Sequence, residues 1–380
     1  MDLLRRAARH AAAPWLALLV LTAAVWGSAL ANGFVWDDGE IVVRNPVTRD
    51  LSRLGEVLLS PDEVKPYYRP LNRASYLVDH ALFGMDPRAF HAVNLLVHAA
   101  SVLLLFALAR RLFDRTWPAL LAAALLAVHP IHAESVAFVT ARNNLFALAF
   151  ALATLVLFVD ATRRASWPRA WLSGACFFLA LASKEQGAMV LPVAAAWLFL
   201  PGTGATWRGW RAWRALVPHA CALGAYAVLR WIALGAPVGA ATEGPGLLAR
   251  LAQNVWVMPR YLGLVLWPDR LTNFHAPTPT GGALEVMWIA VAWSGVAFAV
   301  VWLVRRPTLA SSVGLLWFAA NLVPIANLVP LPATTPWAER YFHAPAAGLW
   351  IVAADAALRV ARAGERRRRG VLAFACIALL

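Results

Sequence analysis

Charged residues are scarce in this chain of 380 residues, and the scarcity limits what the chain can be. They make up 14% of the sequence, against about 25% in soluble domains, whereas 61% of the residues are hydrophobic. Cysteine is also rare. Cys176, Cys221 and Cys376 lie in apolar segments and show neither metal-ligand spacing nor a disulfide framework. The composition excludes an ordinary soluble domain and predicts a membrane protein, and the 19 Trp and 17 Phe suit many membrane–water boundaries.

Lysine is nearly absent, since the 34 basic residues include just Lys65 and Lys184. The net charge of +14 does not indicate nucleic-acid binding, because the arginines stand in short clusters between apolar runs. Such clusters stay in the cytoplasm and therefore orient a membrane protein. They recur at every second loop, around residues 5–9, 110–115, 163–169, 208–214, 305–306 and 359–369.

Apolar runs near the length of a membrane span, about 20 residues, follow one another along the chain. We predict helices at 14–31, 90–112, 117–132, 136–160, 168–182, 186–201, 213–234, 250–267, 284–304, 309–330 and 341–358, with a last one from Val371 onward. The first follows Arg5, Arg6 and Arg9 as a signal peptide would, but its length favours a retained helix. The expected fold is an all-α polytopic bundle of about 11–12 helices.

The segment 250–267 does not fit a simple alternation of crossings. Residues 213–234 leave the cytoplasm and 284–304 return to Arg305, so the segment between them cannot cross alone. Gln253, Asn254 and Arg260 suit an interfacial or re-entrant helix. The alternative, that one neighbouring segment does not span, stays open at this point.

Acidic residues are few and concentrated. Nine of the 20 lie between residues 32 and 89, in a large first outer loop that we expect to carry short interfacial helices. Asp37 and Asp38 stand just where the first apolar helix ends. Carboxylates at a membrane surface can act as a general base or hold a metal, although Asp also serves as a solvated cap and turn residue.

Further polar side chains return to the same outer face from loops that are distant in sequence. Such groups are costly at membrane depth and usually face a cavity or a partner. They are Arg69, His91 and Asn94; His129, His132 and Glu134; Arg142 to Asn144; Lys184 and Glu185; and Glu339 to Tyr341. His132 and Glu134, with Asp38, are candidate ligands of a divalent cation, but their spacing is not the His-Glu-x-x-His pattern, and such histidines more often cap a helix or bond a neighbour.

The ordered set of motifs resembles a known family. The motifs are Trp36-Asp37-Asp38, Tyr68-Arg69-Pro70, Phe90-His91-x-x-Asn94, His129-Pro130-x-His132-x-Glu134, Ser183-Lys184-Glu185 and Glu339-Arg340-Tyr341. Together they resemble the membrane part of the transmembrane-and-tetratricopeptide-repeat O-mannosyltransferases and their bacterial relatives. The resemblance implies the GT-C fold, a single transmembrane domain over 1–380, and transfer of a sugar, expected to be mannose, from a polyprenyl-phosphate donor.

The resemblance also implies roles for individual residues. Catalytic candidates are Asp37, Asp38 and Glu134; the substrate-binding candidates are Arg69, His91, His132, Arg142, Lys184, Glu185, Arg340 and Tyr341. Arginine and lysine suit a phosphate headgroup, and Arg260 is a further candidate. The acceptor would be a protein hydroxyl, on the periplasmic or outer side of a bacterial-type inner membrane. Membrane lipids are expected partners, and nucleic acids are not.

Two departures from the family pattern accompany the resemblance. After Arg340 and Tyr341 the chain reads Phe342-His343-Ala344, so the second Tyr and the Ser of the relatives are missing. Tetratricopeptide repeats are also absent, and we interpret the C-terminal repeat region as missing or truncated. Three alternatives stay open: a lipid or glycan acceptor, a transporter, and a structural scaffold. Polar residues at one surface rather than the midplane, and the lack of a convincing internal repeat, count against a transporter.

Overall fold

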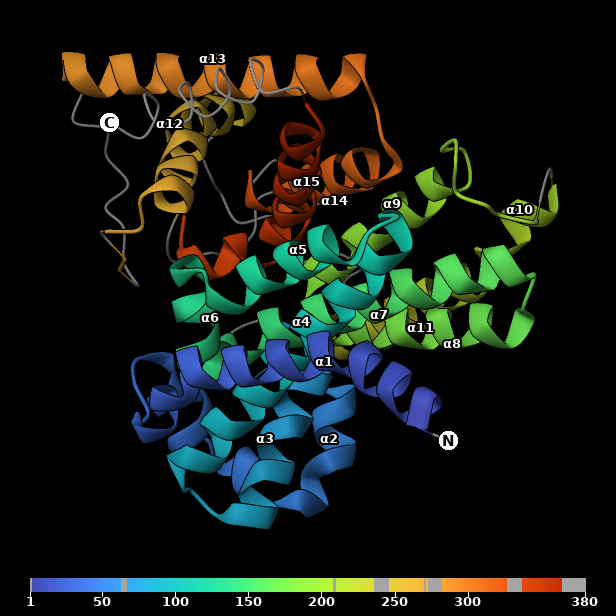
Figure 1. The fold of residues 1–380 in the computed structure, drawn as a ribbon. Helices are drawn as coiled ribbons and strands as arrows, with labels where there is room; N and C mark the ends of the chain where they lie inside the picture. The colour runs from blue at the N-terminus through green and yellow to red at the C-terminus, as the bar shows by residue number, and fades with distance from the viewer. Residues whose placement is uncertain are drawn as a thin grey trace.

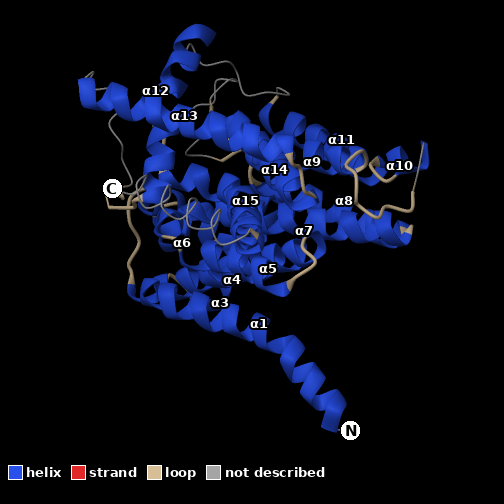
Figure 2. Ribbon diagram, turned by 45° about the horizontal axis from the view of Figure 1, so that its top comes forward, coloured by secondary structure: helices blue, strands red, loops and turns tan. Residues whose placement is uncertain are grey.

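The computed structural model describes residues 2–62, 67–207, 210–235, 246–269, 271–272, 282–326 and 337–363, with side chains from residue 12 onward. Every regular element in these ranges is a helix (Figure 2). The long helices are α1 (Asp2–Trp26), α4 (Pro87–Leu112), α7 (Arg142–Arg164), α8 (Trp167–Ser183), α11 (Val217–Leu234), α12 (Leu247–Leu266), α13 (Ala283–Arg305), α14 (Leu309–Ile325) and α15 (His343–Arg362). The all-helical fold is confirmed.

Each apolar segment predicted from the sequence up to residue 358 coincides with a helix of this bundle. The shorter ones are α5 (Thr116–Val128) and α9 (Val190–Trp197). Six described helices are long and apolar enough to cross a membrane, or seven if the bent pair Thr116–Val128 and Pro130–Ala137 is one span. The chain is therefore a multi-pass membrane protein. The expected helix from Val371 lies outside the described residues.

α12 is not one of the helices that qualify as spans by length and composition. α8 and α14 do not qualify either, so the interpretation of residues 250–267 as an interfacial or re-entrant helix stays a prediction. In Figure 1, α12 lies beside α13, which runs along one edge of the molecule, and the two helices are in contact.

The loop of residues 32–89, which was predicted to carry short helices, does so, and it is called the first loop below. They are η2 (Gly39–Val43), η3 (Pro46–Arg49), η4 (Leu51–Arg53), α2 (Leu54–Leu59) and α3 (Pro70–Phe83). α2 and α3 form a lower layer in Figure 1, at the opposite edge from α13. Asn45 and Asp50 accept hydrogen bonds from backbone N–H groups at the starts of η3 and η4, which caps these short turns.

The core of the bundle is packed closely enough that some positions admit just glycine. α14 and α15 cross at Gly314 and Gly348, where a Cβ on Gly348 would lie 2.5 Å from the Gly314 carbonyl oxygen. Small residues let helix backbones approach in this way inside membranes. The buried cluster around this crossing also includes side chains of α4, α5, α7, α8 and α9.

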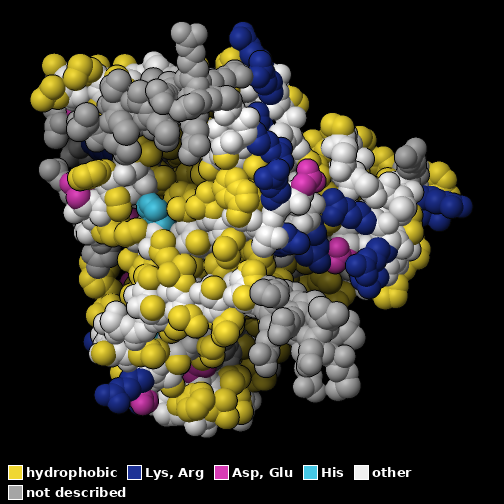
Figure 3. All heavy atoms as spheres, in the orientation of Figure 1, with side chains coloured by type: hydrophobic (Ala, Val, Ile, Leu, Met, Phe, Trp, Pro, Cys, Tyr) yellow, Lys and Arg dark blue, Asp and Glu magenta, His cyan; other side chains and the backbone are white. Residues whose placement is uncertain are grey.

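The arginine clusters at the helix ends meet one another. Arg163 on α7 donates to the carbonyl oxygen of Arg111 at 3.1 Å, and Arg359 on α15 donates to that of Arg306 at 2.7 Å. In the space-filling view, Lys and Arg form a band from the upper middle to the right-hand side, where α8 and α10 (Trp210–Arg214) lie, with a smaller group at the lower left, and apolar side chains cover much of the remaining face (Figure 3).

Candidate functional site

The two adjacent carboxylates of the first loop have different surroundings. Asp38 is fully buried, and its carboxylate accepts hydrogen bonds from the backbone N–H groups of Val35 at 3.1 Å and Thr140 at 2.8 Å. Burial raises the pKa of Asp38, whereas the two backbone donors act in the opposite direction. Asp38 therefore fastens the first loop to η6 (Val139–Ala141), the short helix before α7.

Asp37, in contrast, is partly exposed. Trp36, just before it, has a left-handed backbone with φ of 50°, which non-glycine residues seldom adopt and which is often found at functional sites. Burial raises the pKa of Tyr67, the charge of Arg69 acts against it, and the negative charge of Asp37 makes a smaller contribution in the direction of burial. The turn thus buries one carboxylate and leaves the other partly exposed.

Tyr67 lies next to a group of cationic side chains. The Arg69 guanidinium lies 4.2 Å from the Tyr67 ring centre and donates to the Glu185 carboxylate at 2.8 and 3.2 Å. Arg230, in the C-terminal half of α11, approaches the other oxygen of Glu185 at 3.5 Å. These arginines hold the pKa of Glu185 below its usual value against the opposing effect of burial.

Two further cations flank the ring of Tyr341. The Lys184 ammonium and the Arg340 guanidinium each lie 5.1 Å from its centre. Arg340 forms an ion pair with Glu134 on α6 (Ala133–Ala137), and its backbone N–H donates to the same carboxylate at 2.8 Å. Lys184 donates to the side-chain oxygen of Asn144 at 2.5 Å.

This cationic site, defined as Arg69, Lys184, Arg230 and Arg340, brings together the first loop, the end of α8, α11 and η8 (Glu339–Phe342). Arg69, Arg230 and Arg340 are paired with two carboxylates, Glu185 and Glu134, and Lys184 bonds the neutral Asn144, so the cations of the site outnumber the carboxylates paired with them. The side chains of Arg69, Arg230 and Arg340 remain 18%, 14% and 15% exposed, so the site is open to a ligand. Planar guanidinium groups around a partly desolvated position suit a phosphate.

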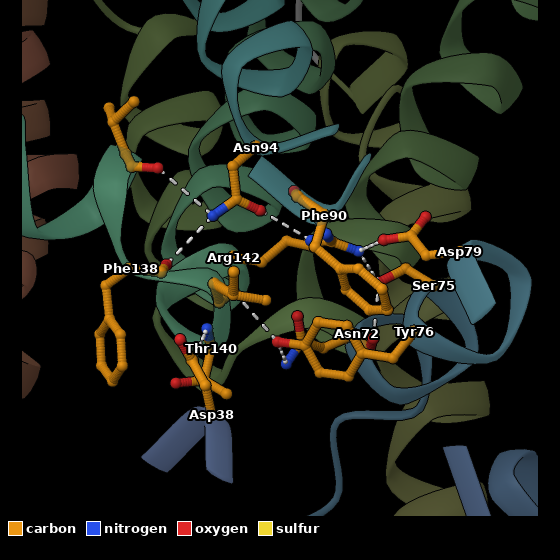
Figure 4. A network of polar contacts seen from close by, with 12 residues as sticks. Asp38, Asn72, Ser75, Tyr76, Asp79, Phe90, Asn94, Phe138, Thr140 and Arg142 are labelled. Atoms are coloured by element: carbon orange, nitrogen blue, oxygen red, sulfur yellow. Dashed lines mark hydrogen bonds and ion pairs between the residues drawn. The ribbon is translucent and has the colours of Figure 1, made fainter. Parts of the chain in front are cut away.

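Arg142 lies elsewhere, in a fully buried network. Its guanidinium donates to Asp79 at 2.5 Å, to Ser75 and Asn94, and to the carbonyl oxygen of Phe90 at 2.9 Å (Figure 4). The network joins α3 and α4 to the start of α7. Arg142 was expected to bind substrate, but its donors are directed to protein acceptors that fix the first loop on the bundle.

His91 and His132 also point away from the cationic site. His91 is buried and approaches the carbonyl oxygen of Gly33 at 3.4 Å. Trp350 donates to Nε2 of His132, so the proton of that ring is on Nδ1, which donates to Nδ1 of His343 at 2.9 Å. The His132 pair thus ties the turn before α6 to α15.

The residues considered for a divalent cation are directed to different partners. Asp38 accepts from the backbone of Thr140, Glu134 is paired with Arg340, and His132 bonds His343. Among the described residues, no group of three or more His, Cys, Asp or Glu side chains is arranged to hold a metal ion. Arg260 is paired with Glu285 and lies outside the cationic site as defined here.

Sequence reasoning missed one member of the site, Arg230, and the role of Asn144, which accepts the hydrogen bond of Lys184. Arg230 lies near the end of a segment that reads as an apolar span, and Asn144 was grouped with its neighbours without a role. A single charge at the end of an apolar helix, next to an outer loop, is the signal that would have found Arg230, because such charges rarely lack a partner or a function.

Comparison with known proteins gives the site a family context. A family model described as dolichyl-phosphate-mannose-protein mannosyltransferase matches residues 77–233. The chain is similar to protein O-mannosyl-transferases. It is 27% identical to one from Caenorhabditis elegans over 364 residues, which is 89% of this chain and 50% of that protein. The resemblance inferred from the motifs is therefore confirmed.

Human relatives match over shorter stretches. TMTC2 is 34% identical over 34% of this chain and 16% of its own length, and TMTC4 is 31% identical over 47% and 28%. The chain thus spans at most about half the length of these curated relatives. Among solved structures, an oligosaccharyltransferase from Archaeoglobus fulgidus is similar with a TM-score of 0.49 and 12% identity, over 90% of this chain and 50% of that one.

Proposed function

We propose that the chain is a GT-C type membrane glycosyltransferase that transfers mannose from a polyprenyl-phosphate donor to a hydroxyl acceptor, namely protein Ser or Thr. The convergence of Arg69, Lys184, Arg230 and Arg340 at the outer helix ends supports this proposal most directly. A phosphodiester carries one negative charge and becomes a dianionic monoester when the sugar leaves. A site with excess positive charge stabilises that leaving group more in the transition state than in the ground state.

Asp37 is the proposed general base. Its carboxylate takes the proton of the acceptor hydroxyl as the hydroxyl oxygen forms a bond to the anomeric carbon. The bond from that carbon to the phosphate oxygen breaks, and its electron pair stays on the phosphate. A single displacement of this kind inverts the anomeric centre and requires one base and no carboxylate nucleophile.

Glu134 is proposed to orient Arg340, because its carboxylate accepts from both the guanidinium and the backbone N–H of that residue. The arginine clusters on α4, α7, α13 and α15 are proposed to face the cytoplasm, which puts the cationic site on the periplasmic or outer side. The site's position at helix ends, rather than at mid-helix, also favours surface chemistry over transport.

The test is transfer of radiolabelled mannose from a polyprenyl-phosphate donor in membranes that contain the chain. Asp37→Asn should lower the rate by at least about 100-fold, the contribution expected of a general base. Asp50→Asn is the matched control, because Asp50 is exposed in the same loop and Asn also caps a helix. Label in the protein fraction supports a protein acceptor, label in the lipid extract identifies another acceptor, and full activity of Asp37→Asn removes Asp37 from the mechanism.

A further inference from the structure

Lys184 differs from the other members of the cationic site in what it contacts. Arg69 and Arg230 share Glu185, and Arg340 is paired with Glu134. The described contacts of the Lys184 ammonium are the neutral side-chain oxygen of Asn144 and the face of Tyr341. Among the described residues, no carboxylate lies within the ion-pair distance of 4.0 Å from it. Its charge is therefore not neutralised by direct pairing.

The side chain of Asn144 is held so that its Oδ1 atom faces Lys184. It lies in the first turn of α7 with its side chain buried, and its amide Nδ2 donates to the carbonyl oxygen of Ala141 at 3.0 Å. This bond fixes which way the carboxamide faces, so that Oδ1 is directed at Lys184. Ala141 ends η6, the same short helix whose Thr140 N–H is bound by Asp38. The acceptor of Lys184 is thus positioned by the element that anchors the acidic loop.

We infer that Asn144 is a positioning residue that holds the Lys184 ammonium in the cationic site with its charge uncompensated, so that this charge is available to the phosphate of the ligand. The inference rests on the proposed function, since it assigns Lys184 to the donor headgroup. An amide oxygen orients an ammonium group as a carboxylate does, but it adds no negative charge that a phosphate would have to displace.

The surroundings make the charge of Lys184 sensitive to such a partner. Burial and the nearby guanidinium groups of Arg69 and Arg340 lower the pKa of Lys184 to about 7, although the negative charges of Glu185 and Glu134 act against them. Because the Asn144 amide adds no charge, the pKa of Lys184 stays close to neutral pH. A phosphate that binds beside it would favour the protonated form, so binding and proton uptake are linked.

Two substitutions separate positioning from a general structural role. Asn144→Asp and Asn144→Ala both lose the hydrogen bond to the Ala141 carbonyl, but the first presents a negative charge to Lys184 and the second presents nothing. We expect the midpoint of Lys184 titration to move up by at least about one pH unit in Asn144→Asp and to move down in Asn144→Ala. A merely structural role would shift the midpoint in the same direction in both variants.

The midpoint can be measured as the pH dependence of Lys184 modification by an amine-reactive reagent, read by peptide mass spectrometry. The chain favours this measurement, because Lys65 is the other lysine and serves as the internal reference. Farnesyl phosphate is the probe for the headgroup, and farnesol is the uncharged control. In the wild-type protein, we expect farnesyl phosphate to slow the modification of Lys184. Farnesol should leave the rate of modification unchanged.

At pH 6, where Lys184 is charged, Asn144→Asp should weaken protection by farnesyl phosphate by at least about tenfold, the effect expected of a neutralising carboxylate. Equal midpoints in the three proteins, or equal protection of wild type and Asn144→Asp, would overturn the inference. Protection of Lys184 in the wild-type protein can be measured whether or not the variants fold. If farnesyl phosphate does not protect Lys184 in the wild type, the inference is also overturned.

The inference and the proposed function can fail separately. Mannose transfer by the wild type together with unchanged midpoints in the variants rejects the role of Asn144 and keeps the transferase. Opposite midpoint shifts with protection by farnesyl phosphate, but without mannose transfer, keep the role of Asn144 and reject the proposed reaction.

Discussion

Asp79 and Arg142, which are 63 residues apart in the chain, form an ion pair of 2.5 Å in which Arg142 is fully buried and the Asp79 side chain is 6% exposed. The pair joins α3 of the first loop to the first residue of α7. Since α7 also carries Asn144, the buried pair determines where the acidic loop lies relative to the cationic site.

Asp79→Asn should destabilise the fold by about 3–5 kcal/mol, because it leaves the buried guanidinium of Arg142 without a counter-charge. The measurement is the thermal midpoint of the purified protein in detergent. Glu56→Gln is the control, since it removes an acid of the same loop that is exposed and paired with Arg53, and its midpoint should stay close to wild type. Equal midpoints in the two variants would contradict the role given to the buried pair.

Asp38→Asn should behave differently from Asp37→Asn. The buried carboxylate of Asp38 accepts two backbone N–H bonds, and an amide in its place can turn just one oxygen toward them. We expect a loss of about 1–3 kcal/mol in unfolding free energy for Asp38→Asn. Asp37→Asn should leave the thermal midpoint near wild type while transfer is lost. A stable Asp38→Asn protein with a wild-type midpoint would show that this anchor is dispensable.

As the pH rises, the titration of Lys184 should lower the affinity for a phosphate ligand but raise the stability of the fold. Lys184, with its pKa lowered to about 7 by burial and nearby arginines, loses its charge as the pH rises, so affinity for a phosphate falls above that value. Between about 7 and the ordinary lysine value of 10.5, the unfolded chain binds more protons at this position than the folded one. The contribution of Lys184 to stability therefore increases with pH in the same window.

Lys184→Arg tests this pair of effects, because guanidinium stays charged throughout the range. Binding of farnesyl phosphate to the variant should lose its decline above pH 7, and the pH dependence of the thermal midpoint should flatten. A decline that persists unchanged in Lys184→Arg would assign the titration to another group.

The crossing of α14 and α15 should be intolerant of any side chain at Gly348. An added Cβ would lie 2.5 Å from the Gly314 oxygen, so Gly348→Ala should cost about 1–3 kcal/mol through overpacking. Gly295→Ala is the matched control on α13, where a Cβ meets no atom within 4 Å and alanine favours the helix. Thermal midpoints of the two variants should therefore move in opposite directions.

The sequence was sufficient for the helices and for several of the side chains that lie together in the cationic site, for physical reasons. Long apolar runs report burial in lipid directly, and so the predicted segments up to residue 358 are found as helices. Arg69, Lys184, Glu185, Arg340 and Tyr341 do come together, because polar groups at membrane helix ends share one face. The sequence could not distinguish Asp37 from Asp38, since the burial of Asp38 goes with a hydrogen bond from Thr140, which is 102 residues away.

The roles of Arg142 and His132 were likewise beyond the reach of sequence. An arginine in an outer loop can bind a ligand or a buried acid equally well, and the outcome depends on Asp79, which is 63 residues away. His132 reads as a ligand in a short motif, but its partner His343 stands 211 residues later. Such pairings follow from three-dimensional packing, which no local spacing records.

The double attachment of Arg340 to Glu134 has a mechanical consequence. Because one carboxylate binds both the side chain and the backbone of Arg340, η8 (Glu339–Phe342) is unable to pivot about its own axis without breaking one of the two bonds. The attachment of η8 to α6 thus depends on a single carboxylate, whose loss would release both bonds at once.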